Sequence, residues 1–283
     1  MGTNYLDGVI DTHVHSSPDV RQRKMNDFEI MQESAKRNVR AVVIKSHHME
    51  TAARAALINE INSRCNNKNH FQMFGGITLN TQVGGLNPYA VEASLKLGGK
   101  IVWMPTLESE FSMKKQGKSG GVACVRNGRV VDELIPILRL IKDYEAALAT
   151  GHLSPEEIFS VVETAKNMGM NKIIISHPES NLVGLTIEQQ FMLARDYDVM
   201  LEHCYAQPVG EGKYSLNFET NLEAIKFIGS KNTIIATDAG QIQNPYWYDS
   251  LSESIKYLSD NGVSSKDLDL MTKVNPAKIL GII

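Results

Sequence analysis

Eight short runs of apolar and β-branched residues recur along this 283-residue chain, and segments with helical periodicity separate them. The runs span residues 8–15, 41–45, 71–79, 100–104, 146–150, 172–176, 199–203 and 233–237. Helices are predicted at residues 27–38, from Ser154 onward, and at 186–197, 218–228 and 250–261. Ser154 is followed by Pro155 and two acidic residues, which is typical of a helix start.

This alternation of strand and helix predicts an α/β fold with a parallel sheet. Eight such units favour a closed (β/α)8 TIM-type barrel over an open, doubly wound sheet. The glycine-rich phosphate fingerprint of a dinucleotide-binding fold is missing after the first run, where His13 and His15 stand instead. We therefore expect a single domain over residues 1–283.

One irregularity interrupts the pattern after the fourth run, at about residues 113–131. Residues 120–131 predict two short strands around Asn127-Gly128, a dipeptide that strongly favours a two-residue hairpin turn. A hairpin inserted at this end of a barrel strand can cover the site as a flap or decorate the surface. The sequence leaves both open.

Composition bears on the partners and the cellular location of the protein. A net charge of −3 gives no reason to expect nucleic acid as a partner, and the one tight basic cluster, Lys114, Lys115 and Lys118, lies among glycine and serine. Three scattered cysteines argue against a disulfide framework. No apolar run approaches the length of a membrane span, and the first strand begins within ten residues of Met1. We expect a cytoplasmic protein with a small-molecule substrate, and self-association stays open.

Titratable residues gather where the predicted strands end. Seven of the eight histidines stand there, namely His13, His15, His47, His48, His152, His177 and His203, together with Lys45 and Asp238. The carboxyl ends of barrel strands carry the active site in folds of this type. On spacing alone His13 and His15 are compatible with a metal site or with two hydrogen-bonded core histidines, and the clustering favours the metal. Zn²⁺ is the default ion, with Mn²⁺, Fe²⁺ or Ni²⁺ also compatible.

The period of two along a strand predicts which side chains share a face. Asp11 falls on the face of His13 and His15, so we expect it to orient a metal-bound imidazole. Lys45 and His47 share a face, as do Leu201 and His203. By this parity His48 and Glu202 are predicted to point away from the lumen.

The ordered set of motifs resembles the amidohydrolase superfamily of metal-dependent hydrolases. The matching features are His-x-His on the first strand, a histidine closing each of the fifth and sixth strands, an aspartate closing the eighth, and a terminal helix at Asn275–Gly281. The resemblance implies that His13, His15, Asp238 and His177 or His152 bind the metal. It also implies that Asp238 shuttles a proton from the metal-bound water to the leaving group.

The fourth strand departs from the binuclear members of that superfamily. Those members carry a bridging Lys or Glu there, whereas residues 101–107 contain neither and Glu108 lies beyond Pro105. A mononuclear site is favoured, with a carboxylated Lys45 as the binuclear alternative. A lysine inside a barrel must pair with an anion or lose its charge, and contact with substrate is the favoured role for Lys45. His47 and His203 are further candidates for substrate contact.

These residues predict a metal-dependent hydrolase that cleaves a C–N or C–O bond of a small molecule, such as an amide, cyclic amide, lactone or ester. Asp238, His177 and Lys45 are its predicted catalytic residues. Three alternatives stay open: a metal-dependent decarboxylase or C–C lyase, a phosphoesterase, and a barrel that binds a metal or ligand without turnover. The phosphoesterase is disfavoured because Asp238-Ala239-Gly240 lacks the second histidine expected there.

Overall fold

The computed structural model describes residues 4–65 and 70–282. Its central strands are β1 (Ile10–His15), β2 (Ala41–Lys45), β3 (Gln72–Phe74), β4 (Gly76–Thr78), β5 (Ile101–Trp103), β8 (Ala147–Ala149), β9 (Ile173–Ser176), β10 (Met200–His203) and β13 (Thr233–Ile235). All of their pairings are parallel, in the orders β1-β2-β3 and β4-β5-β8-β9-β10-β13.

The two sheets join into one barrel. Only Gly75 separates β3 from β4, so the predicted strand at 71–79 is present but interrupted. At the other end, a parallel bridge between Val14 and Ala239 brings the segment after β13 against β1. The strands thus follow one another around a closed ring, which confirms the predicted (β/α)8 fold.

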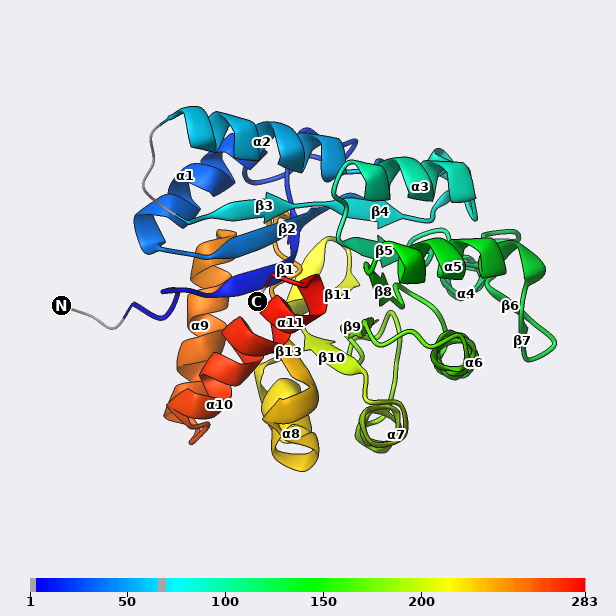
Figure 1. Ribbon diagram of the computed structural model, residues 1–283. Coiled ribbons are helices and arrows are strands. Elements are labelled where there is room, and N and C mark those ends of the chain that lie inside the picture. Colours follow the sequence, from blue (N-terminus) through cyan, green and yellow to red (C-terminus); the bar gives the residue numbers. More distant parts are fainter. Residues whose placement is uncertain (1–3, 66–69, 283) are drawn as a thin grey trace.

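Helices surround these strands (Figure 1). They are α1 (Asp27–Arg37), α2 (Ala52–Arg64), α3 (Pro88–Lys96), α4 (Glu110–Lys115), α5 (Ile135–Asp143), α6 (Pro155–Asn167), α7 (Ile187–Tyr197), α8 (Phe218–Ile228), α9 (Trp247–Asp260), α10 (Ser265–Asp269) and α11 (Asn275–Leu280). The expected start of α6 is confirmed, because the Ser154 side chain accepts from Glu157 N and the Glu157 side chain accepts from Ser154 N.

The barrel interior is packed with side chains. Trp103 and Ile174 fill it together with Ile10, Ala41, Val43, Ile101, Ala147, Ala149, Met200 and Ile234. A second set of apolar side chains on the same strands, such as Leu148 and Leu201, packs outward in the layer below the helices. The barrel interior is therefore filled by apolar side chains, and polar side chains gather above them at the ends of the strands.

Two hairpins extend beyond the barrel. The expected one, β6 (Val125–Arg126) with β7 (Arg129–Val130), turns at Asn127 and Gly128, both at positive φ. It packs against α6, where the Ser160 hydroxyl donates to the Gly128 carbonyl at 3.5 Å. It therefore decorates the surface. The second hairpin, β11 (Ala206–Gly210) with β12 (Lys213–Leu216), follows β10 and was not expected from the sequence.

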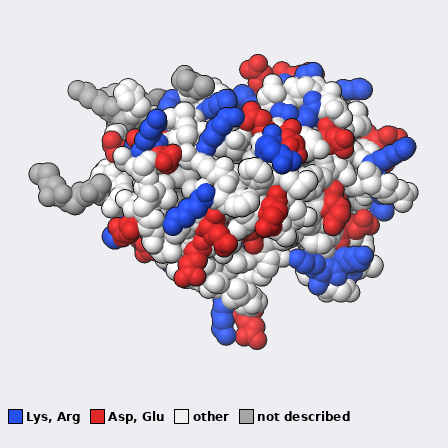
Figure 2. Space-filling view, turned by 90° about the horizontal axis from the view of Figure 1, so that it is seen from below, with Lys and Arg blue, Asp and Glu red and all other residues white. Residues whose placement is uncertain are grey.

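The outer surface carries both signs of charge. Figure 2 shows acidic and basic side chains interspersed over the face seen from below. Within the described residues, no helix is both long enough and apolar enough to cross a membrane.

Candidate metal centre

Five imidazoles form a closed ring at the carboxyl ends of the strands. Around this ring the centroid distances are 5.5 Å (His13–His15), 4.7 Å (His15–His47), 6.0 Å (His47–His152), 5.1 Å (His152–His177) and 5.9 Å (His177–His13). All five residues are buried. The structure thus brings together histidines of β1 with others that follow β2, β8 and β9.

Asp238 joins this ring from the segment after β13. Its Oδ1 lies 3.1 Å from His13 Nε2 and 3.0 Å from His15 Nε2. Burial favours the neutral acid, but the two imidazoles outweigh it and hold the pKa of Asp238 well below its usual range. The Asp238 side chain is 18% exposed, whereas those of His13 and His15 are at most 1% exposed. Asp238 is therefore the member of this triad that solvent reaches.

Glu202 fixes the orientation of the His13 ring. Its carboxylate accepts from Thr12 Oγ1 at 2.6 Å and from His13 Nδ1 at 2.9 Å. Since a carboxylate only accepts, Nδ1 carries the proton and the Nε2 lone pair of a neutral His13 faces Asp238. The expectation that Glu202 points away from the lumen is wrong.

The parity of β10 explains this error. Met200 packs in the lumen and Leu201 packs outward below the helices, so Glu202 returns to the lumen and His203 faces outward. His203 Nδ1 donates instead to Glu179 Oε2 at 3.0 Å. His203 does not join the imidazole ring. His48 lies outside that ring, as expected, with Nδ1 3.6 Å from Asp19 Oδ1.

Asp11 does not orient an imidazole, contrary to expectation. The register of β1 against β2 shifts between Asp11 and Val14, which breaks the strict alternation of faces. The Asp11 carboxylate accepts from the backbone N–H of His13 at 3.1 Å and from Thr237 Oγ1 at 2.7 Å. Burial raises its pKa to about 7. Asp11 therefore holds the irregular strand that presents His13.

Lys45 points into the same site, on the face predicted for it. Its Nζ lies 3.0 Å from His13 Nε2 and 5.4 Å from the centroid of the Trp103 ring. Burial lowers the pKa of Lys45, although Asp238 and Glu202 partly offset this effect. The amine is thus shifted toward its neutral form. His47 is held by a hydrogen bond between its Nδ1 and Thr106 Oγ1 at 2.9 Å.

The donor set fits a divalent metal ion. His13 Nε2, His15 Nε2 and Asp238 Oδ1 lie within 4.8 Å of one another. A neutral imidazole lone pair and a carboxylate oxygen are both acceptors, so their approach requires a cation or a shared proton between them. Without a metal ion, a proton shared between His13 and Asp238 satisfies both acceptors. Burial disfavours the protonated imidazole, but Asp238 and Glu202 raise the pKa of His13 to about 9.

Buried nitrogens without partners support the same conclusion. Within the described residues, both ring nitrogens of His177, Nδ1 of His152 and Nδ1 of His15 have no hydrogen-bond partner. An unpaired buried polar group costs about 1–3 kcal/mol. Burial lowers the pKa of both His152 and His177, which keeps these rings neutral and able to coordinate. The backbone is also strained at His177 (φ 30°) and Asp238 (φ 50°), as it often is at functional sites.

Two glycines allow the ligand-bearing segments to approach closely. A Cβ at Gly240 would lie 1.9 Å from the His15 carbonyl oxygen, and one at Gly151 would lie 2.3 Å from the Met104 carbonyl oxygen. Gly240 follows Asp238 by two residues and Gly151 precedes His152. These glycines are a sequence signal for the site that sequence reasoning missed.

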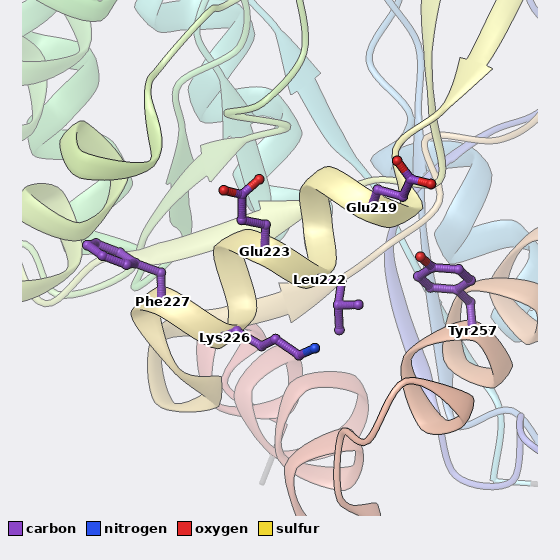
Figure 3. A pocket seen from close by; sticks show the side chains of 6 residues that line it. All are labelled: Glu219, Leu222, Glu223, Lys226, Phe227 and Tyr257. Carbon is purple, nitrogen blue, oxygen red and sulfur yellow. The ribbon is translucent and has the colours of Figure 1, made fainter.

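A hollow elsewhere on the surface lacks this chemistry. Figure 3 shows a groove between α8 and α9, with a volume of about 440 Å³, lined by Glu219, Leu222, Glu223, Lys226, Phe227 and Tyr257. All six side chains belong to these two outer helices. The candidate functional site is therefore the histidine cluster.

Comparison with known proteins places the chain by family and by fold. The model of a family described as "Family of unknown function (DUF6282)" matches residues 8–202. No curated protein matches the sequence.

Solved structures resemble nearly the whole chain. An amidohydrolase from Pseudomonas aeruginosa is 12% identical over 98% of this chain and 96% of its own, with a TM-score of 0.67. A dihydroorotase is 15% identical over 98% and 70%, with a TM-score of 0.62. A 2,6-dihydroxybenzoate decarboxylase from Rhizobium is 11% identical over 98% and 99%, with a TM-score of 0.54. These likenesses show that the chain shares the fold of these proteins.

Proposed function

We propose that this chain, which belongs to the family of unknown function DUF6282, is a metal-dependent enzyme that hydrolyses a C–N or C–O bond of a small molecule. One observation carries the proposal. His13 Nε2 and His15 Nε2 converge on Asp238 Oδ1 in a buried site at the carboxyl end of the barrel. Neutral imidazoles with one carboxylate are the ligands that Zn²⁺ takes in hydrolytic sites.

His13, His15 and Asp238 would hold the ion, with His177 or His152 completing the set. We propose a single ion, because β5, the fourth strand of the barrel, carries no lysine or glutamate that could bridge a second one. When bound, such an ion supplies Lewis-acid polarisation of a carbonyl and an activated water at neutral pH.

The chain's own groups handle the proton and the substrate oxygen. Asp238 uses Oδ1 toward the two histidines, which leaves Oδ2 on the solvent-reaching side chain free to take a proton and deliver it to the leaving group. Lys45, and whichever of His152 and His177 does not bind the ion, can each donate a hydrogen bond to a carbonyl oxygen on which negative charge develops.

Decarboxylation is the second candidate, because the structurally similar proteins include 2,6-dihydroxybenzoate decarboxylase. The two reactions differ in their use of water. Hydrolysis in ¹⁸O-labelled water places the label in the product, whereas decarboxylation releases carbon dioxide and leaves the product unlabelled.

The test is elemental analysis of protein purified without added metal, followed by assays on lactones, cyclic amides and esters. With the substrate so found, we expect Asp238→Asn reloaded with metal to lose on the order of 10²–10⁴-fold in turnover, because the proton carrier is gone. Asp260→Asn, an exposed carboxylate at the end of α9, is the control and should match the parent protein. Undiminished turnover by metal-stripped Asp238→Asn would refute the proposal.

A further inference from the structure

Arg23 is a buried cation in the loop between β1 and α1. Its side chain is 3% exposed, and its Nε donates to Asp19 Oδ2 at 2.8 Å. Its terminal nitrogen Nη2 is also buried, yet has no hydrogen-bond partner among the described residues. A guanidinium has five N–H donors, so the bond to Asp19 leaves donors free for a second anion.

Backbone contacts place Arg23 beside the segment that carries Asp238. Arg23 forms an antiparallel bridge with Gln241, three residues after Asp238, and the next residue, Lys24, donates its backbone N–H to the Gly240 carbonyl at 2.9 Å. Its partner Asp19 accepts from Ser46 Oγ, just after β2, at 3.3 Å. Arg23 is therefore held between the ends of β2 and β13, on either side of β1.

Electrostatics agree with this position. The half-buried Tyr214 on β12 has its pKa raised by burial and by Asp238, while Arg23 and Arg21 oppose that rise. Tyr214, on the β11–β12 hairpin, is thus near enough to Asp238 and Arg23 to be affected by both charges.

We propose that Arg23 binds a carboxylate of the substrate through Nη2, so that the substrate is a small molecule bearing a carboxylate close to the bond that is cleaved. Bonds from Arg to a carboxylate are charge-assisted and directional, which orients the substrate over Asp238. This inference rests on the proposed hydrolytic function and names its substrate class.

The test compares carboxylate with carboxamide in the metal-loaded, full-length protein. Calorimetric titration measures binding of glutarate, of its neutral diamide and of inorganic phosphate. The variant Arg23→Lys keeps a positive charge beside Asp19 but loses the guanidinium fork. The pair Asp19→Asn with Arg23→Gln removes both charges together and so avoids a buried unpaired carboxylate. Arg21→Gln, exposed in the same loop, is the matched control.

We expect the parent and Arg21→Gln to bind glutarate, and both Arg23 variants to bind it on the order of tenfold more weakly or worse. The diamide should bind weakly to all of them, because it has no carboxylate. Damage to the fold would weaken the binding of both ligands alike, whereas loss of Arg23 weakens only the binding of the carboxylate. Unchanged glutarate binding in both Arg23 variants overturns the inference, as does equal binding of glutarate and diamide, or tighter binding of phosphate.

Metal content and turnover are measured separately. If the protein binds metal and hydrolyses its substrate but the Arg23 variants bind glutarate as the parent does, only this inference is refuted. If the protein binds glutarate through Arg23 but takes up no metal, only the proposed function is refuted.

Discussion

His13 is held at both of its ring nitrogens, and this double contact decides what the residue can do. Nδ1 donates to Glu202, and Nε2 faces Asp238 and Lys45. A carboxylate behind a metal-binding imidazole fixes its tautomer and raises its basicity. The Glu202→Gln variant replaces the charge with a neutral amide of the same shape. We expect it to lower metal affinity by about 10–100-fold, measured by competition against a chelator of known affinity.

The control for Glu202→Gln is a second buried pair of the same chemistry. Glu179 accepts from His203 Nδ1 at 3.0 Å, outside the imidazole ring. Glu179→Gln should leave metal affinity unchanged. Equal losses in both variants would mean that removing any buried carboxylate disturbs the protein, and would remove the case for a specific role of Glu202.

At this scale the sequence predicted the members of the site better than their contacts. Histidines at strand ends are conspicuous, and His13, His15, His47, His152 and His177 do come together. Glu202 was misassigned because Met200 and Leu201 are both apolar, so the strand has no alternation that fixes its faces. Asp11 was misassigned because a register shift in β1 has no signature in the residue types.

Element boundaries were largely predictable because each buried strand is a compact apolar run between polar turns. The strand β2 and the helix α8 have the limits that the sequence predicted. The hairpin β11–β12 was missed, since Pro208 and the exposed polar residues around Glu211-Gly212 are typical of a loop. Its strands are defined by pairing with each other, and the residue pattern carries no buried face to reveal them.

The approach of the segment after β13 to β1 depends on Gly240. Its φ of 121° is unfavourable for other residues, and a Cβ would clash with the His15 carbonyl. We expect Gly240→Ala to destabilise the protein by about 1–3 kcal/mol and to lower its metal content, since His15 and Asp238 are both displaced. Denaturant unfolding and elemental analysis measure the two effects.

Gly262→Ala separates strain from clash. Gly262 has a φ of 90°, but a Cβ there meets nothing within 4 Å. This variant should be destabilised less and should keep its metal. If it lost as much metal as Gly240→Ala, close packing against His15 would not be the reason for a glycine at position 240.

At the scale of the whole molecule, the site lies across the seam where the barrel closes. His13 and His15 belong to the first strand, whereas Asp238 follows the last. The backbone joins these two strands through a bridge between Val14 and Ala239 and through the His15 N–H, which donates to the Ala239 carbonyl at 2.7 Å. A metal held by these three residues would therefore tie the first strand of the barrel to the last.

Metal removal should consequently loosen the seam more than the rest of the barrel. At a free metal concentration 100-fold above the dissociation constant, binding stabilises the fold by about 2.7 kcal/mol, or roughly 5 °C in melting temperature for a chain of this size. Hydrogen exchange should rise on chelation most in β1 and residues 236–241, which carry three of the proposed ligands, and least in β4 and β5, whose ends carry none. The variant His15→Ala, which removes one ligand, should show no response to chelator. A uniform rise in exchange across all strands, or a melting temperature indifferent to metal, would show that no ion bridges the first and last strands.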